Sequence, residues 1–331
     1  MMNFNARIPA DVFGFNSRRT VLGFCPTAPA PGTRFAAPDY RYTFIPDVFE
    51  RLRLWWESAD PREPLFISGP AGCGKTSMVM QFLARVNAPA VTLTCRRRMD
   101  KYELIGQWGA AGNGSLIWID GPATIAWRTG AVLVVNEPTT APADVWVACN
   151  DILEGDSILI DRNGETVPRH PNTRVVFTDN CALGSETDLS GYIGRNNQDE
   201  SVRDRCWHLQ MQGPDTATQI DLLLRKTAPQ AEGLDPKKVK ALCTAVVKFG
   251  AWVQEEQSHG NSVQSVRSLS SRTLIRLLSI LLTFLKTPGS IKNPVQTALR
   301  LALTDSLDTT AAAGLQNATQ YCVSELRAVF A

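Results

Sequence analysis

Four apolar runs in the first two thirds of the chain have the length and composition of buried β-strands. They span residues 65–68, 90–94, 131–135 and 174–178. The run at 131–135 is apolar at every position, which is typical of a central strand in a parallel sheet that is covered on both faces. Segments with helical spacing of apolar residues separate these runs, so the pattern predicts an α/β domain built around a parallel sheet.

Two further regions contain short alternating runs, and we interpret both as β-hairpins inserted between the strands of the sheet. In the first, residues 115–119 and 124–127 flank an Asp-Gly-Pro turn. In the second, residues 157–160 and 165–167 flank an Asp-Arg-Asn-Gly turn. The expected core is therefore a parallel sheet with inserted hairpins.

The two ends of the chain have different patterns. Residues 1–40 mix Pro, Gly and aromatic residues without a sustained period, which predicts an extended N-terminal arm. The α/β domain is expected at 41–213, and the helical spacing from 214 to 331 predicts a smaller all-α domain. The expected helices lie near 47–57, 78–86 and 143–154 in the first domain and near 216–225, 236–255, 270–286 and 294–305 in the second, with a last helix that ends at Phe330.

Composition narrows the class of protein. The chain has 331 residues, of which 44% are hydrophobic and 20% are charged, as expected for a globular protein with a large core. The net charge of +2 gives no global reason to expect a nucleic-acid or membrane partner. The most apolar segment, 273–285, contains Arg276 and is too short to span a bilayer, so it predicts a buried helix.

The eight cysteines occur singly, with no C-x-x-C pair and no Cys/His grouping of zinc-ligand spacing. This distribution is typical of reduced thiols in an intracellular protein. The first residues do not have the pattern of a secretory signal peptide, so we expect a cytoplasmic location.

A complete G-x-x-x-x-G-K-T motif lies between a predicted strand and a predicted helix. Its glycines allow successive backbone N–H groups to face an anion, and the positive N-terminal end of the following helix adds to the attraction. Lys75 is placed to reach the β- and γ-phosphates of ATP, and the Thr76 hydroxyl to bind Mg²⁺. The predicted nucleotide contacts are Gly69, Pro70, Ala71, Gly72, Cys73, Gly74, Lys75, Thr76 and Ser77.

Polar residues follow two of the predicted strands. Asn136 and Glu137 come after the strand at 131–135, and Asp179 and Asn180 come after the strand at 174–178. An open α/β sheet binds its ligand at the carboxyl ends of its strands, so these residues are expected beside the phosphate-binding loop.

With these elements in order, most of the chain resembles the MoxR branch of the AAA+ ATPases, and most closely the ATPase subunits of cobalt chelatases. Besides the phosphate-binding loop, the resemblance depends on the order and spacing of short motifs rather than on any single one. They are Asp11-Val12-Phe13-Gly14, Leu104-Ile105-Gly106, Arg128-Thr129-Gly130, Ile152-Leu153-Glu154-Gly155, His170-Pro171, Asp204-Arg205 and Ser271-Arg272-Thr273. The resemblance implies an AAA+ core followed by a helical lid domain, assembled as a ring that is expected to be a hexamer.

The resemblance also implies roles for single residues. Glu137 would orient the attacking water, and Asn180 would hold that water or the γ-phosphate as sensor 1. Arg205 would be an arginine finger acting on the neighbouring subunit's nucleotide, with Arg203 as the rival, and Arg272 would reach the γ-phosphate from the lid. Without the resemblance, simpler roles are favoured. Asn180 would be a turn residue, Arg205 would form a surface ion pair, and Arg272 would be a positive charge at the start of a helix.

One position departs from the family pattern, which has Asp-Glu where this chain has Asn136-Glu137. An amide supplies no negative charge to Mg²⁺, although a contact that runs through a water tolerates a neutral oxygen. We therefore expect Thr76 and Asn136 at the metal. Nucleotide binding should be retained, whereas the missing negative charge can slow ATP hydrolysis.

The favoured function is an ATP-hydrolysing remodelling motor that acts on a partner protein, which by resemblance would carry a von Willebrand A-type domain. One alternative is a nucleic-acid motor or a restriction-type NTPase, for which the basic clusters at 96–98 and 237–238 would form the track. Another alternative is a structural ring that hydrolyses ATP poorly, which Asn136 suggests.

Overall fold

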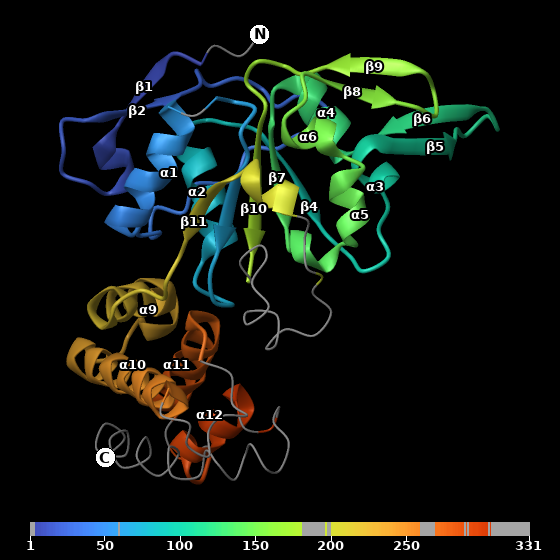
Figure 1. Cartoon of the computed structure of the whole chain (residues 1–331). Coiled ribbons are helices and arrows are strands. Elements are labelled where there is room, and N and C mark those ends of the chain that lie inside the picture. The colour runs from blue at the N-terminus through green and yellow to red at the C-terminus, as the bar shows by residue number, and fades with distance from the viewer. Residues whose placement is uncertain are drawn as a thin grey trace. The chain divides into compact units, whose positions relative to one another are not determined.

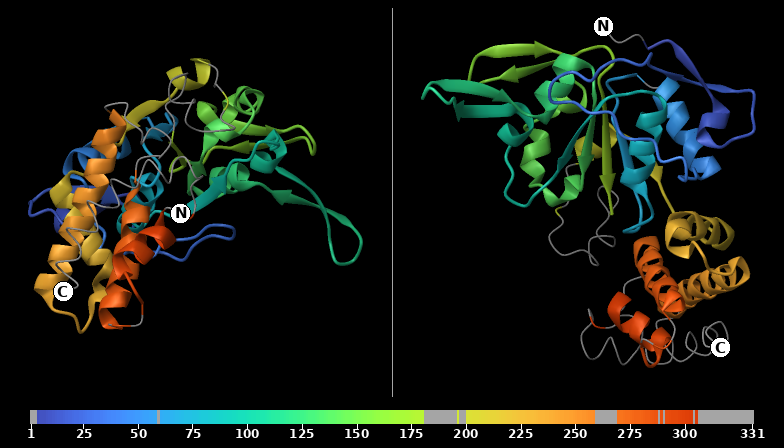
Figure 2. Two further views of the ribbon diagram at one scale, coloured as in Figure 1. Left: turned by 90° about the horizontal axis from the view of Figure 1, so that it is seen from below. Right: turned by 180° about the vertical axis from the view of Figure 1, so that it is seen from behind.

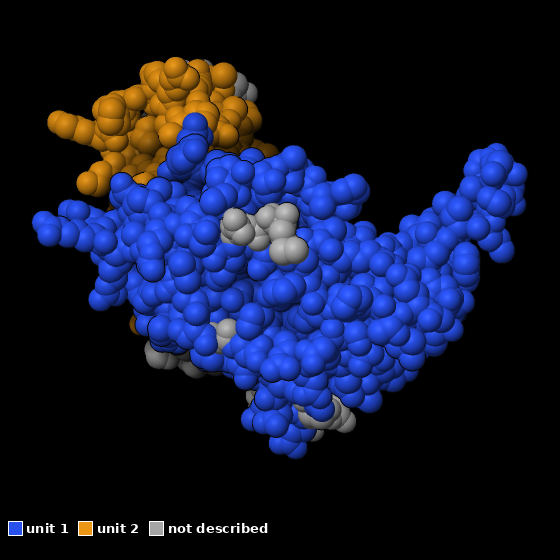
Figure 3. All heavy atoms as spheres, turned by 90° about the horizontal axis from the view of Figure 1, so that it is seen from above, with its two compact units in different colours: residues 1–212 blue, residues 213–331 orange. Residues whose placement is uncertain are grey.

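The computed structural model describes residues 4–58, 60–180, 196, 200–258, 269–287, 289, 291–303 and 305. The chain divides into two compact units, residues 1–212 and 213–331, which Figure 3 colours separately. The first unit is α/β and carries the phosphate-binding loop, and the second is helical where it is described.

A five-stranded parallel sheet forms the centre of the first unit (Figure 1). Its strands, in spatial order, are β11 (Trp207–Gln210), β3 (Leu65–Ser68), β10 (Arg174–Asp179), β7 (Val132–Asn136) and β4 (Ala90–Thr94). The predicted fold class and four of these strands are confirmed, whereas β11 was not predicted. Asn136 lies opposite Thr178 and Asp179 lies opposite Ser68, so three strands end side by side.

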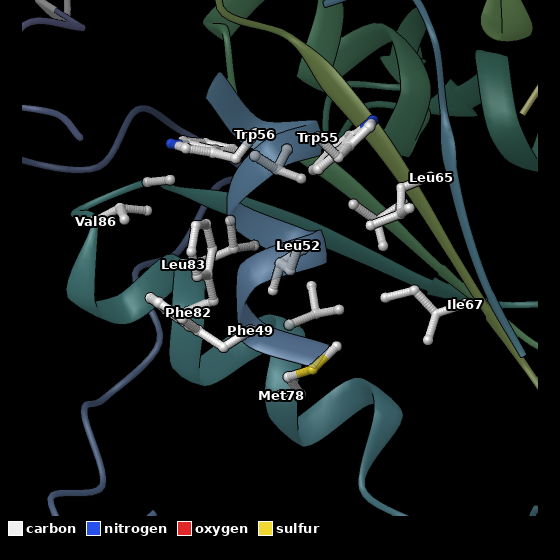
Figure 4. Packing of buried hydrophobic residues seen from close by; sticks show 14 of the residues in the cluster. Phe49, Leu52, Trp55, Trp56, Leu65, Ile67, Met78, Phe82, Leu83 and Val86 are labelled. Carbon is white, nitrogen blue, oxygen red and sulfur yellow. The ribbon is translucent and has the colours of Figure 1, made fainter. Parts of the chain in front are cut away.

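Helices of the first unit lie around this sheet. They are α1 (Pro46–Ser58), α2 (Lys75–Arg85), α3 (Lys101–Ile105), α4 (Pro122–Thr129), α5 (Ala143–Val147), α6 (Asn150–Leu153) and α8 (Glu200–Asp204). The single helix predicted at 143–154 is instead the two short helices α5 and α6. The predicted amphipathic helix α1 buries Leu52, Trp55 and Trp56 against α2 and β3 (Figure 4). Burial of these large side chains fixes α2, and with it the phosphate-binding loop, against the sheet.

The N-terminal segment is more ordered than a simple extended arm. It forms the antiparallel pair β1 (Ala6–Pro9) and β2 (Thr20–Gly23), joined through the 3-10 helix η1 (Ala10–Phe13). Phe13 and Phe24 are buried in the same hydrophobic cluster as Trp56. The Trp56 indole also donates a hydrogen bond of 2.7 Å to the Leu22 carbonyl.

The first predicted hairpin has the wrong second strand. β5 (Gly106–Ala110) pairs with β6 (Leu116–Asp120), and residues 124–127 belong to helix α4. Pro122 at the first helical position and left-handed Gly130 at the C-cap are ordinary signals for the two ends of a helix. The second hairpin, β8 (Ser157–Ile160) with β9 (Glu165–Pro168), is confirmed.

The second unit contains α9 (Thr216–Ala231), α10 (Pro236–Ser258), α11 (Ser271–Lys286) and α12 (Pro294–Ala302). The prediction of a buried helix near 273–285 is confirmed, because α11 buries a row of leucines against the other helices. No helix among the residues described in the structure has the length and apolarity needed to cross a membrane. The helix predicted to end at Phe330 lies outside the described residues.

Candidate nucleotide-binding site

The loop between β3 and α2 has the backbone conformation that its glycines allow. Gly72 and Gly74 have φ values of 77° and 97°, in the left-handed region that residues with a Cβ rarely adopt. Gly69 has φ 152°, and a Cβ there would lie 2.2 Å from the Met211 carbonyl oxygen, just beyond β11. Gly69 is therefore required by the close approach of two neighbouring strand ends.

Lys75 holds the centre of this site. Its side chain is 7% exposed, and its ammonium group donates to the carbonyl oxygens of Gly69 at 2.7 Å and Pro70 at 2.9 Å. It also donates to Asn180 Oδ1 at 2.9 Å, which joins the loop to the end of β10. Burial lowers the pKa of Lys75, while the nearby Cys73 and Asp179 side chains oppose that shift.

Thr76, Asn136 and Thr178 form a triangle of neutral oxygen atoms next to Lys75. Asn136 Oδ1 accepts hydrogen bonds from the Thr76 and Thr178 hydroxyls, each at 2.9 Å, and the two hydroxyls are 3.1 Å apart. Mg²⁺ prefers hard oxygen ligands and keeps several waters, so this donor set fits the predicted metal. Within the described ranges, no group of three or more His, Cys, Asp or Glu side chains could hold a metal ion.

Glu137 directly follows β7 and has an unusual backbone. Its φ of 58° and ψ of 47° are left-handed, and its N–H donates to the Thr178 carbonyl at 2.7 Å. The short helix η2 (Pro138–Thr140) begins immediately after it. The same strand ends therefore position Glu137, Asn136 and Asn180.

The predicted arginines lie on two other elements. Arg205 follows α8, and its Nε is 3.0 Å from Glu154 Oε1. Arg203 is in α8 itself, and its carbonyl oxygen is 2.9 Å from His208 Nε2. Arg272 is in the first turn of α11, in the second unit. Their roles as finger and sensor stay predictions.

Sequence reasoning missed two residues at this site, Thr178 and Thr139. Thr178 contacts Thr76 and Asn136, and Thr139 donates to Asp179 from both its N–H and its hydroxyl. Their only signal in the sequence is adjacency to residues already selected, because the contacts join residues that are 40 to 102 positions apart in the chain.

The fold and this site define a nucleotide-binding protein of the P-loop class with a parallel sheet. Residues 64–206 match the family described as "AAA domain (dynein-related subfamily)". This part of the chain is similar to AAA domains, in agreement with the resemblance to the MoxR branch of the AAA+ ATPases that the sequence motifs indicated. The more specific resemblance to cobalt chelatase stays a prediction.

Curated relatives align with part of the chain. Protein NorQ of Paracoccus denitrificans is 29% identical over 211 residues, which cover 63% of this chain and 73% of NorQ. Protein CbbQ of Hydrogenophilus thermoluteolus is 31% identical over 140 residues, which cover 42% of this chain and 51% of CbbQ. The denitrification regulatory protein NirQ of Stutzerimonas stutzeri is 28% identical over 208 residues, which cover 62% of this chain and 69% of NirQ.

The close approach at Gly69 gives a testable prediction. Gly69→Ala should weaken ATP binding at least tenfold and lower the melting temperature, because its Cβ would collide with backbone, and such overpacking costs about 1–3 kcal/mol or more. Gly74→Ala is the matched control: it also strains a left-handed residue, but its Cβ would meet no atom within 4 Å. Calorimetric titration and thermal melts compare the two variants, and equal losses would contradict the steric account.

Proposed function

We propose that the protein is an ATP-hydrolysing remodelling motor that assembles as a ring, expected to be a hexamer, and acts on a partner protein. The observation that carries the proposal is the hydrogen-bonded contact between Lys75 and Asn180, together with the oxygen cluster of Thr76, Asn136 and Thr178. The AAA domain over 64–206 supports nucleotide binding at these residues.

Each residue of the site has one task in this proposal. Lys75 binds the terminal phosphates, and Thr76 and Asn136 hold Mg²⁺, which neutralises phosphate charge when bound. Glu137 orients the attacking water and takes up its proton, and Asn180 holds that water or the γ-phosphate. Lys75 then exchanges its contacts with loop carbonyls for contacts with phosphate oxygens, which are stronger acceptors.

Two arginines would complete the site. Arg205 is proposed to reach the nucleotide of the neighbouring subunit, and Arg272 to contact the γ-phosphate from the second unit. Arg205 is paired with Glu154, whose side chain is 57% exposed. In the proposal, Arg205 exchanges its contact with Glu154 for contact with phosphate oxygens, which a guanidinium group binds through charge-assisted hydrogen bonds.

The β5–β6 hairpin supports a protein partner rather than a nucleic acid. It projects from the first unit (Figure 2) and exposes Leu116 at 71%, Ile119 at 49% and Trp108 at 46%. Residues 106–119 include no charged side chain, whereas a nucleic-acid track needs Lys or Arg to neutralise phosphates. An uncharged apolar arm is better suited to contact a protein surface.

The basic cluster at 96–98 gives the alternative motor less support. Arg96 forms an ion pair with Glu103, so part of its charge is already neutralised within the chain. DNA-stimulated ATPase activity with a steep salt dependence would nevertheless favour that alternative.

The partner protein is proposed to carry a von Willebrand A-type domain, and this proposal depends on the family resemblance alone. NirQ is by its name a regulatory protein, and a regulatory role is consistent with action on another protein.

The proposal is tested by mixing two inactive variants. Arg205→Ala should bind ATP but lose turnover, since fingers supplied in trans typically contribute about 10³–10⁵ in rate. Glu137→Gln should also be inactive. Mixed rings should recover activity, because some interfaces then pair an intact Glu137 with an intact Arg205.

Steady-state ATPase assays over a range of mixing ratios measure the recovery, with native mass spectrometry to verify that both variants share rings. An Arg203→Ala mixture is the control for the rival finger. Mixed rings without activity at any ratio would contradict action in trans.

Asn136 gives a second prediction. Asn136→Asp should lower the Mg²⁺ concentration for half-maximal ATPase activity, and raise turnover if the wild type is slow, because a carboxylate attracts the cation and is nearly isosteric with the amide. The amide hydrogen bond that is lost, Asn136 Nδ2 to the Leu93 carbonyl, is long at 3.4 Å. Mg²⁺ titrations of both proteins measure the midpoint. An unchanged midpoint, or weaker ATP binding by the Asp variant, would show that added charge repels the phosphates instead.

A further inference from the structure

The turn that carries Glu137 is held in a costly conformation. A left-handed backbone is unfavourable at a residue with a Cβ, such as Glu137 with φ 58°, because the Cβ comes too close to the following carbonyl oxygen. Only Asn87, Glu137 and Asn293 adopt positive φ among the described residues other than glycine. Strained residues of this kind persist where the surrounding structure over-determines them, and they concentrate at functional sites.

Asp179 constrains this turn from the neighbouring strand. Its Oδ2 accepts hydrogen bonds from the Thr139 N–H at 2.9 Å and from the Thr139 hydroxyl at 2.8 Å. Both side chains are 1% exposed, so water does not compete for these bonds. Hydrogen bonds to a charged acceptor are roughly twice as strong as neutral ones, and burial strengthens them further.

Other contacts hold the same turn on further sides. The Asn196 N–H donates to the Thr139 carbonyl at 2.7 Å, and its side-chain amide donates to the Ala141 carbonyl at 3.0 Å. The Trp146 indole donates to the Pro138 carbonyl at 3.1 Å. These contacts are hydrogen bonds to backbone carbonyl oxygens. Asp179 differs because it contributes a buried carboxylate.

We propose that Asp179 is a positioning residue for Glu137. Its carboxylate fixes Thr139, two residues beyond Glu137, and so prevents the turn from relaxing out of the left-handed conformation. The inference rests on the proposed role of Glu137 in ATP hydrolysis. Asp179 also directly precedes Asn180, so one strand end sets the places of both groups that would hold the attacking water.

A buried carboxylate is expensive unless hydrogen bonds compensate it, and Thr139 supplies two. A residue needed only for packing on β10 would be apolar, like the buried Val175 and Val176 of the same strand. The position of the charge at the strand end, against the turn, is what a positioning role requires.

The test separates positioning from binding and from folding. Asp179→Ala and Thr139→Val should each lower kcat by about 100-fold, the scale expected for a catalytic group misplaced by about 1 Å, with ATP affinity changed less than threefold. Thr139→Ser restores the hydroxyl and should recover most of the rate lost in Thr139→Val.

Two outcomes would overturn the inference: an unchanged kcat in Asp179→Ala, or a kcat in Thr139→Ser no higher than in Thr139→Val. Hydrogen exchange at the Thr139 and Thr140 amides is a readout that does not depend on turnover. Asp179→Ala should speed exchange at these amides and not in α2. Unchanged exchange would contradict the inference. A wild-type protein that does not hydrolyse ATP would instead reject only the proposed function.

Discussion

The buried ammonium group of Lys75 links the phosphate-binding loop to the adjacent strand of the sheet. It donates to two carbonyl oxygens of its own loop and to Asn180 at the end of β10. A buried ammonium without acceptors would cost several kcal/mol, so the loop must keep its carbonyls turned inward for as long as no phosphate replaces them. The loop is thus preorganised around an ammonium group that can bind an anion such as phosphate.

That arrangement depends on the register of the parallel sheet. Asn136 and Thr178 are cross-strand neighbours, and both contact Thr76 at the start of α2. The approach of β11 leaves no space for a side chain at Gly69. Chemical groups from four separate segments therefore meet only because the strands are parallel and end together, and the core around Trp56 keeps α2 in place against them.

The sequence was sufficient for the features that local chemistry encodes. The motif ending in Lys75-Thr76 predicted both the loop and its place between strand and helix, and apolar runs predicted four of the five sheet strands. β11 was missed because Trp207–Gln210 is short and mostly exposed at the edge of the sheet, so it has no apolar run. The prediction of a strand at 124–127 was wrong because four residues are too few to distinguish the helical from the strand spacing of apolar residues. Contacts such as Thr139 with Asp179 depend on tertiary structure, and no single-sequence pattern encodes them.

The central claim is that Lys75 forms the anion-binding centre of a nucleotide site, and calorimetric titration with ATP and Mg²⁺ tests it most directly. Wild type and Lys75→Ala are compared, with Lys101→Ala as the matched control, because Lys101 is paired with Asp161 on the second hairpin. The account predicts saturable binding by wild type and Lys101→Ala and a loss of at least 100-fold in Lys75→Ala, since a charge-assisted contact to phosphate contributes about 3 kcal/mol. Equal ATP affinity of all three proteins would contradict the account.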